Sequence, residues 1–371
     1  MRIGIPKEIK DHEYRVGATP AGVKTLAAAG HEILVQSEAG MRIGFLDHAY
    51  AAAGARIVAT AGEVYAADMI MKVKEIQPVE WDYLRPGQLL FCYLHLAPDP
   101  QLTSKLLEKQ VIGIAYETVT DRHGQMPLLI PMSIIAGRLS IQMGAWALQM
   151  ANGGNGTLLG GAPGVPPGKV LVLGGGTVGS QAARIAVGMG AEVTVLDVNP
   201  TRLGYLDELY NGRLKTGYSD THTIETLAPT ADLVVGSVLI PGKLAPKIIT
   251  RATVRAMQPG SVLVDVAIDQ GGCSETSRPT NHSHPTYLDE GVVHYCVANM
   301  PGAAARTATL ALTQATLPYA LKLAGKGVNA ALQQDEGLRQ GLQVHCGSVT
   351  YRNVAHDLGY PHISAEQALG L

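Results

Sequence analysis

The sequence has 371 residues, which is enough for two domains with a sizeable core each. Hydrophobic residues make up 46% of the chain and charged residues 16%, so the composition is that of a globular protein and excludes a disordered one. The net charge of −2, without a run of lysine or arginine, argues against a surface that binds nucleic acid or membrane by charge, and no apolar run reaches the length of a membrane span.

The first 130 residues alternate between strand-like and helix-like patterns, which is typical of a parallel sheet with crossover helices. We expect a helix at 19–30, in which Thr19 is the N-cap, Pro20 is the first helical residue and Gly30 stands at the C-cap. The other elements expected in this part are a helix at 98–110 and strands at 2–6, 31–36, 68–74, 89–96 and 111–117.

A second block of alternating elements begins at Lys169. Before it, the pattern predicts a long helix at 132–152, and the glycine-rich loop at 153–168 marks a domain boundary. The elements expected in the second block are strands at 170–174, 192–197, 232–238, 261–267 and 292–297, and helices at 177–190, 199–210 and 246–258. From about residue 305 the pattern is helical again.

These patterns predict an α/β fold with two Rossmann-like, doubly wound parallel-sheet domains and a cleft between them. The tail from Lys326 has too few apolar residues for a core of its own, so we expect it to dock on the first domain. A discontinuous substrate and catalytic domain would then comprise 1–130 and 306–371, and a nucleotide-binding Rossmann domain would comprise 131–305.

The N-terminal sequence and the spacing of the cysteines predict where the protein is located. The N-terminal "MRIGIPKEIK" lacks the apolar core of a signal peptide. We therefore expect a cytoplasmic protein with free thiols and no metal site, because the four cysteines are far apart and show no CxxC spacing. They are Cys92, Cys273, Cys296 and Cys346.

The stretch "KVLVLGGGTVGSQAARIA" contains a GxGxxG motif with a strand before it and a helix after it. The N-terminus of that helix offers N–H donors and a partial positive charge to a pyrophosphate. Gly174 permits the tight turn, Gly176 lets phosphates approach the backbone, and Gly179 lets helix and strand pack closely. The motif in this setting predicts a dinucleotide site.

The next strand ends in Asp197, where the ribose-binding acid of such a site belongs. A carboxylate there accepts hydrogen bonds from the 2′-hydroxyl of NAD and repels the 2′-phosphate of NADP. Two alternatives stay open at this point: Asp197 is the N-cap of the following helix, or Arg202 accommodates a phosphate.

Four ionisable residues fall at or just past predicted strand ends, where open α/β sheets bind their ligands. Arg15 follows the first strand, Lys74 and His95 close two later strands, and Asp269 follows "SVLVDVAI" in the second block. Each has a plain structural alternative: a surface arginine, a lysine paired with Glu75, a hydrogen-bonded core histidine and a turn aspartate.

Taken together, the four residues suit one kind of chemistry. Arg15 offers a planar fork for a carboxylate, and Lys74 can donate to a carbonyl oxygen and stabilise charge there. His95 can exchange a proton near neutral pH. Hydride transfer itself needs only close contact between a carbon atom and the nicotinamide. The set therefore predicts oxidoreduction of a 2-oxo acid or a 2-amino acid.

Several long segments resemble bacterial alanine dehydrogenases, members of the alanine dehydrogenase and pyridine nucleotide transhydrogenase family. They include "MRIGIPKEIKDHEYRVGATPAGV", "MIMKVKE", "FCYLHLA", "PMSIIAGRLSIQMGA", "DVAIDQGGCSETSRPT" and "HYCVANMPGAAARTATLALTQATLPY", and the resemblance runs from residue 1 into the tail. It implies reversible, NAD-dependent oxidative deamination of L-alanine to pyruvate and ammonium by a homohexamer.

The resemblance also implies roles for individual residues. Arg15 and Lys74 would hold pyruvate or alanine, and His95 and Asp269 would be the acid–base pair, with the principal member left open. Beyond the glycine loop, the implied cofactor-binding residues are Ser133, Thr177, Val178, Asp197, Arg202, Ser219, Val238, Leu239, Val266, Ala267, Ile268, Asp269, Arg278, Val297, Ala298, Asn299 and Met300.

Two other functions remain open from the sequence. The NAD(H)-binding component of a proton-translocating transhydrogenase shares this architecture, but the absence of membrane spans and the presence of both Lys74 and His95 argue against it. A related amino-acid or opine dehydrogenase differs in the size of its substrate pocket, which no sequence pattern reveals.

Overall fold

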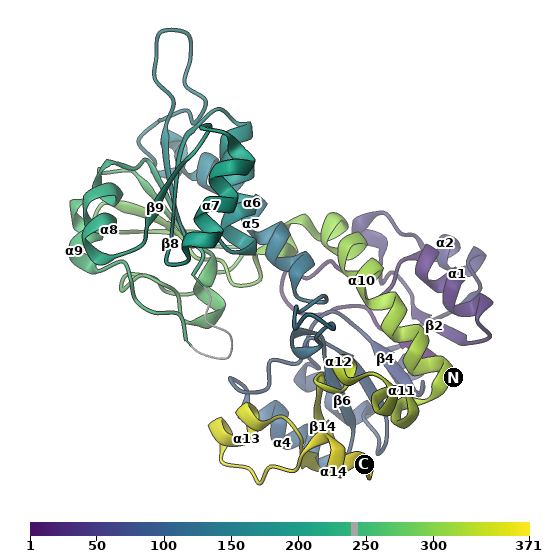
Figure 1. Ribbon diagram of the computed structural model, residues 1–371. Coiled ribbons are helices and arrows are strands. Elements are labelled where there is room, and N and C mark those ends of the chain that lie inside the picture. The colour runs from purple at the N-terminus through teal and green to yellow at the C-terminus, as the bar shows by residue number, and fades with distance from the viewer. Residues whose placement is uncertain (239–243) are drawn as a thin grey trace. The chain divides into compact units, whose positions relative to one another are not determined.

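The computed structural model describes residues 1–238 and 244–371, which form two compact units (Figure 1). Unit 1 comprises Met1–Met132 and Ala304–Leu371, and unit 2 comprises Ser133–Ala303. In both described ranges, no helix combines the length and the hydropathy that a membrane crossing requires. Each unit contains one mixed, mostly parallel sheet, which confirms the predicted α/β class.

The sheet of unit 1 has eight strands in the order β15-β14-β6-β5-β4-β1-β2-β3. The strands from β6 to β3 are parallel, whereas β14 runs antiparallel to β6, and β15 to β14. The order therefore reverses between β1 and β4, which makes this pair the topological switch point. The strands are β1 (Arg2–Ile5), β2 (Glu32–Gln36), β3 (Ala55–Val58), β4 (Met69–Met71), β5 (Leu89–Cys92), β6 (Ile112–Ala115), β14 (Leu342–His345) and β15 (Ser348–Val349).

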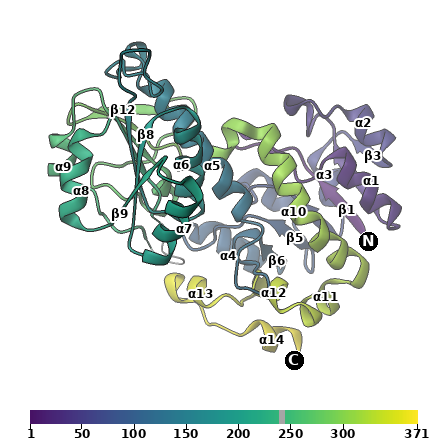
Figure 2. The ribbon, with the colours of Figure 1, turned by 45° about the horizontal axis from the view of Figure 1, so that its top comes forward.

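Helix α1 (Pro20–Ala28) of unit 1 begins as the sequence predicts. The Thr19 hydroxyl accepts the N–H of Gly22, Pro20 follows it, and Gly30 has a left-handed φ of 86° just past the end. Helix α10 (Ala305–Lys326) lies beside α1 (Figure 2). The remaining helices of the unit are α2 (Asp47–Ala52), α3 (Ala61–Tyr65), α4 (Pro100–Glu108), α11 (Val328–Gln334), α12 (Glu336–Arg339), α13 (Arg352–Leu358) and α14 (Ala365–Leu369).

The sheet of unit 2 has seven strands in the order β12-β13-β11-β10-β7-β8-β9, all parallel except β12. The six parallel strands have the strand order of dinucleotide-binding folds, with the switch point between β7 and β10. They are β7 (Lys169–Leu173), β8 (Glu192–Asp197), β9 (Lys215–Tyr218), β10 (Leu233–Gly236), β11 (Val262–Asp265) and β13 (Val292–Tyr295), and the antiparallel strand is β12 (Thr286–Asp289).

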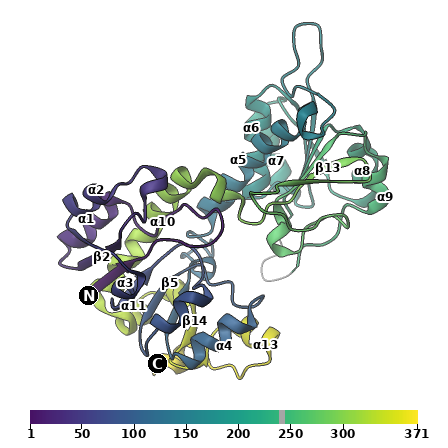
Figure 3. The same cartoon turned by 180° about the vertical axis from the view of Figure 1, so that it is seen from behind.

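Helices cover both faces of the unit 2 sheet. Figure 1 and the reverse view in Figure 3 show α5 to α7 on one face and α8 and α9 on the other. Gly137 of α5 packs so closely on α6 that an added Cβ would lie 2.2 Å from the carbonyl oxygen of Val178. The helices are α5 (Ile130–Ala147), α6 (Thr177–Gly188), α7 (Pro200–Tyr210), α8 (Thr221–Leu227) and α9 (Arg251–Ala256).

Two predicted strands end earlier than their hydropathy suggests. The sequence places Lys74 and His95 at strand ends, but β4 ends at Met71 and β5 at Cys92, so each residue is the third after its strand. The cause lies in the hydrogen bonding: the N–H groups of Lys74 and His95 donate to side-chain carboxylates and not to a neighbouring strand. His95 also has a left-handed φ of 47°, which no strand residue adopts.

The predicted helix at 246–258 is wrong over its first half. Only Arg251–Ala256 is helical, because the Thr250 hydroxyl caps the helix by accepting the N–H of Thr253. Before that cap, residues 244–250 are not helical, and Ile249 forms a bridge with Ser274. The sequence analysis also missed β3, β9 and β12, which are short strands of mixed polarity. The helical pattern expected from about residue 305 is wrong for part of the tail, because β14 and β15 lie there and extend the sheet of unit 1.

Candidate active site

Three of the four ionisable candidates lie in unit 1, on loops that leave neighbouring strands. Arg15 follows β1, Lys74 follows β4 and His95 follows β5, and these strands are adjacent in the sheet. Since the carboxyl ends of parallel strands meet at one edge, the three residues share the edge at which open α/β sheets bind ligands. Asp269 belongs to unit 2, so the expected acid–base pair is divided between the units.

Arg15 is almost fully buried, with 2% of its side chain exposed, and it pairs with Glu13. Its Nε and Nη2 donate to the two carboxylate oxygens of Glu13 at 2.7 and 2.5 Å, and Nη1 donates to the Met132 sulfur at 3.2 Å. Burial alone would lower the pKa of Arg15, but the hydrogen bond and the charge of Glu13 outweigh it and raise that pKa. A substrate carboxylate at Arg15 would therefore share the guanidinium with Glu13.

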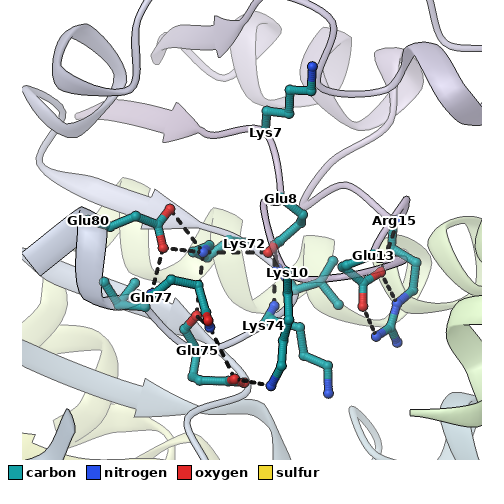
Figure 4. A network of polar contacts seen from close by, with 12 residues as sticks. Lys7, Glu8, Lys10, Glu13, Arg15, Lys72, Lys74, Glu75, Gln77 and Glu80 are labelled. Carbon is teal, nitrogen blue, oxygen red and sulfur yellow. Dashed lines mark hydrogen bonds and ion pairs between the residues drawn. The ribbon is translucent and has the colours of Figure 1, made fainter. Parts of the chain in front are cut away.

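Lys74 is half-buried, and its main chain is held by Glu8 from the loop after β1 (Figure 4). Glu8 Oε1 accepts the N–H of Val73 at 2.6 Å and that of Lys74 at 3.2 Å. The sequence alternative, a pair between Lys74 and Glu75, competes with a pair that the structure shows: Glu75 Oε1 lies 2.5 Å from Lys10 Nζ. That hydrogen bond counters the effect of burial and lowers the pKa of Glu75 to about 2.

His95 has a 46% exposed side chain, so it is not a core histidine. Glu117, which follows β6, accepts the N–H of His95 at 2.8 Å, and its Oε1 lies 4.0 Å from His95 Nδ1. The ring stacks on Tyr93 with centroids 5.9 Å apart. Glu117 thus holds the backbone of His95, and Tyr93 lies parallel to its ring. A carboxylate on the Nδ1 side is the kind of partner that orients a proton-transferring imidazole.

In unit 2 the glycine loop follows β7 and leads into α6. Gly174 has a left-handed φ of 96°, and an added Cβ at Gly179 would lie 1.7 Å from the Gly174 carbonyl oxygen, so both positions require glycine for the fold itself. At Gly176 an added Cβ would meet none of the described protein atoms within 4 Å. Gly176 is the N-cap of α6 and no side chain caps the helix there, which leaves its first N–H groups available to an anion.

Asp197 ends β8 as predicted, but it is not the N-cap of α7. Asn199 caps that helix by accepting the N–H groups of Thr201 and Arg202. The Asp197 carboxylate accepts the N–H of Gly175 at 2.6 Å and that of Asn199 at 2.8 Å, which ties it to the glycine loop. Arg202 Nε donates to the Gly175 carbonyl oxygen at 2.5 Å, so the arginine also braces the loop.

Asp269 is exposed on the 3-10 helix η6 (Val266–Gln270), directly after β11. The loop that begins there is organised by the fully buried Asp265. Its carboxylate accepts the N–H groups of Ala267, Cys273 and Ser274 at 3.1, 2.8 and 3.3 Å and the Ser277 hydroxyl at 2.5 Å. Arg278 follows at the far end of the same loop, where its guanidinium stacks 4.1 Å from the centre of the Tyr287 ring.

The other residues implied for the cofactor follow the same edge of the unit 2 sheet. Ser219 follows β9, Val238 follows β10, and the segment Val297–Met300 follows β13. Ser133 lies four residues before Gly137, so it shares the face of α5 on which Gly137 packs against Val178 of α6. Leu239 lies outside the described residues.

The sequence analysis missed the acids that hold the candidates in place: Glu8, Glu13, Glu117 and Asp265. A signal for Glu117 and Asp265 existed, since each ends or follows a predicted buried strand. All four cysteines are free thiols. Across residues 1–238 and 244–371, no group of three or more histidine, cysteine or acidic side chains is arranged to hold a metal.

The strand order and the glycine loop of unit 2 define a dinucleotide-binding α/β protein. The alanine dehydrogenase/PNT family has an N-terminal domain model that matches residues 4–136 and a C-terminal domain model that matches residues 140–352. The chain belongs to this family.

Relatives of known identity match over the full length. The chain is 53% identical over 371 residues to an alanine dehydrogenase of Halomonas elongata and 54% identical over 373 residues to one of Methanococcus maripaludis, with complete coverage of both chains in each case. A solved L-alanine dehydrogenase structure superposes with a TM-score of 0.94 at 50% identity, covering 97% of this chain and 99% of that one. A transhydrogenase of Sinorhizobium meliloti gives a TM-score of 0.81 at 25% identity, covering 95% and 99%.

Proposed function

We propose that the chain catalyses the reversible reaction in which L-alanine, NAD⁺ and water give pyruvate, ammonium, NADH and a proton. The observation that carries this proposal is the similarity of the whole chain to alanine dehydrogenases at 53% and 54% identity. The placement of Arg15, Lys74 and His95 at one sheet edge, and of the glycine loop and Asp269 at another, supports it.

The residues of unit 2 fit NAD(H). The first N–H groups of α6 have no side-chain cap, and Gly176 leaves open space beside them, as a pyrophosphate requires. Asp197 stands at the position of the ribose-binding acid, and its negative charge favours NAD over NADP. Arg202 braces the glycine loop, so its contact with Gly175 supports the same preference. When bound, the nicotinamide supplies or accepts the hydride.

The residues of unit 1 suit the substrate. Lys74 and Arg15 hold the carboxylate and the carbonyl oxygen of pyruvate, with Glu13 sharing and orienting the guanidinium. His95, oriented by Glu117, exchanges the protons that ammonia addition and loss of water require, and Asp269 is its partner in unit 2. Residues 1–130 and 306–371 are then the substrate and catalytic domain, and residues 131–305 the NAD-binding domain.

A spectrophotometric assay tests the proposal. NADH oxidation, followed by its absorbance, should require both pyruvate and ammonium and should stop when either is omitted. A transhydrogenase component would bind NADH without this dependence, and an opine or other amino-acid dehydrogenase would prefer a bulkier oxo acid or an amino acid in place of ammonium. A His95→Ala variant should lose turnover while its NADH affinity stays unchanged, and near-normal turnover would remove His95 from the mechanism.

We also propose a cytoplasmic homohexamer, on the resemblance to alanine dehydrogenases described above. Native mass spectrometry of the purified chain tests the assembly, because six copies of a 39.0 kDa chain differ clearly in mass from two or four. Fractionation of expressing cells tests the localisation.

A further inference from the structure

A buried cluster of charges lies at the end of β4, behind Lys74 (Figure 4). Its centre is Lys72, whose side chain is fully buried. Lys72 Nζ lies 2.8 Å from Glu80 Oε2, on the 3-10 helix η2 (Pro78–Tyr83), and 3.5 Å from Glu8 Oε2. Two buried carboxylates therefore share one ammonium group.

Both oxygens of Glu80 accept hydrogen bonds from Lys72 Nζ, at 2.8 and 3.2 Å, whereas Glu8 faces the same ammonium group at 3.5 Å. Glu8 is thus a second buried acid beside an ammonium group that already has a hydrogen-bonded carboxylate. Burial raises the pKa of Glu8 to about 7, with Lys72 opposing that shift. A fold that needed only stability would gain from an amide side chain at this position, because an amide oxygen can accept N–H groups without burying a second negative charge.

Glu8 also holds the backbone at Lys74. Its Oε1 accepts the N–H groups of Val73 and Lys74, at 2.6 and 3.2 Å, just where β4 has ended. A carboxylate makes stronger hydrogen bonds to N–H donors than a neutral group does. Glu8 therefore fixes the direction in which the Lys74 side chain leaves the sheet edge.

We propose that Glu8 is a positioning residue, which acts on the substrate through Lys74 by fastening the main chain of residues 73 and 74. This inference rests on the proposed function, because it assumes that Lys74 binds the oxo acid. Lys72 supplies the positive charge that favours the ionised carboxylate of Glu8. Glu80 opposes that ionisation through its own charge, but it accepts two hydrogen bonds from Lys72 Nζ and so holds the ammonium group in place.

The charged and titratable groups that face Glu8 come from every element packed around it. Lys72 stabilises its ionised form, and Glu13 and Glu80 disfavour that form. Arg15 is electrostatically coupled to Glu8, as are Tyr65 of α3, Cys92 of β5 and Tyr116 after β6. The tyrosines and the cysteine have pKa values raised by burial, so they stay neutral while Glu8 titrates.

The sign of the pH effect follows from the raised pKa. As pH rises through about 7, Glu8 loses its proton and accepts stronger hydrogen bonds from the N–H groups of Val73 and Lys74. The value of kcat/KM for pyruvate should therefore rise. The free energy of unfolding changes in the opposite sense. Between pH 4.5 and about 7 the folded chain retains a proton on Glu8 that the unfolded chain has released, so the folded state loses stability as pH rises. Above about pH 7 this loss is complete. If Glu8 had only a structural role, its ionisation would lower the stability of the folded chain without raising kcat/KM.

The test compares Glu8→Gln with wild type in the complete chain, using kcat/KM for pyruvate at saturating NADH and ammonium from pH 5.5 to 9. At pH 8 we expect kcat/KM to fall by on the order of tenfold to a hundredfold, as a small misplacement of a binding group does. The profile should lose the one ionisation near pH 7 that belongs to Glu8, and any ionisation that belongs to His95 should remain. NADH affinity should not change, and the thermal midpoint at pH 8 should be no lower than in wild type.

Three further variants keep the outcome decisive. Glu63→Gln, an exposed acid that caps α3, is the matched control and should leave the profile unchanged. Glu8→Asp retains the charge with a shorter arm and should keep the ionisation at a reduced rate, which gives a result even if Glu8→Gln does not fold. Lys74→Ala separates the two hypotheses: if it keeps full activity, the proposed role of Lys74 is wrong. If Lys74→Ala is inactive while both Glu8 variants behave as wild type, the inference about Glu8 is wrong.

Discussion

Replacement of Asp265 by asparagine should destabilise unit 2 and loosen the loop that carries Asp269. Asp265 is fully buried, and its carboxylate accepts three main-chain N–H groups and one hydroxyl group. The amide that replaces it has one acceptor oxygen. If that oxygen takes the Oδ2 position, the N–H groups of Cys273 and Ser274 and the Ser277 hydroxyl keep their acceptor, but the amide nitrogen then faces the N–H of Ala267.

The size of the effect follows from these contacts. Each surviving hydrogen bond loses its charge assistance, which costs about 1 kcal/mol, and the unmatched N–H of Ala267 costs about 1–3 kcal/mol more. Removal of a buried charge returns some of this free energy. The free energy of unfolding of unit 2 should therefore fall by about 3 kcal/mol, which moves the urea midpoint by about 1–2 M for a domain of this size.

The two tryptophans of the chain allow the unfolding of each unit to be followed separately. Trp81 lies in unit 1 and Trp146 in unit 2, and the chain contains 2 in all. In a Trp81→Phe background, urea unfolding at one protein concentration reports unit 2 through Trp146. Ser277→Ala is the matched control, because it removes one of the four donors and should cost about 1 kcal/mol. A shift of less than about 0.5 kcal/mol for Asp265→Asn would refute the assignment of Asp265 as the organiser of this loop.

Two further predictions concern the glycine loop and the buried lysine. Gly179→Ala should weaken NADH binding at least about tenfold, because the added Cβ would lie 1.7 Å from the Gly174 carbonyl oxygen. Gly188 lies in the same helix, and a Cβ added there meets no described atom within 4 Å. The Gly188→Ala variant should therefore bind NADH normally in a fluorescence titration. Lys72→Met should cost about 3–5 kcal/mol at pH 8, because it leaves Glu80 and Glu8 buried without a cation. The unfolding of unit 1 would be followed through Trp81 in a Trp146→Phe background. That cost should shrink towards pH 5, where protonation removes the unpaired charge, and an equal cost at both pH values would contradict the ionic explanation.

The elements that the sequence predicts best are those whose signals are local. Helix α1 begins where Thr19 and Pro20 predict it, and α6 follows β7 as the glycine motif requires, because caps, turns and hydrophobic alternation act within a few residues. The candidate site was predictable to the same extent: a strand end marks the edge of the sheet, and a charged residue just past that end is visible in the sequence.

Local signals fail where a distant side chain takes over the hydrogen bonding of the backbone. The apolar pattern continues past Met71 and past Cys92, so it predicts longer strands than the structure has. Beyond Met71 the N–H groups of Val73 and Lys74 donate to Glu8 and not to a neighbouring strand. His95 leaves the sheet because its backbone turns into the left-handed region against Glu117. Neither partner can be inferred from the sequence around the strand.

The same device recurs at each candidate residue. Glu8 holds the N–H of Lys74 from 66 positions away, Glu117 holds that of His95 from 22 positions away, and Asp265 holds the loop that begins next to Asp269. A hydrogen bond from a buried carboxylate gives a loop the fixed geometry that ladder bonds give a strand, and it leaves the side chain outside the sheet, where a substrate can reach it. The residue types follow from the chemistry, but their positions depend on acids that lie elsewhere in the sequence.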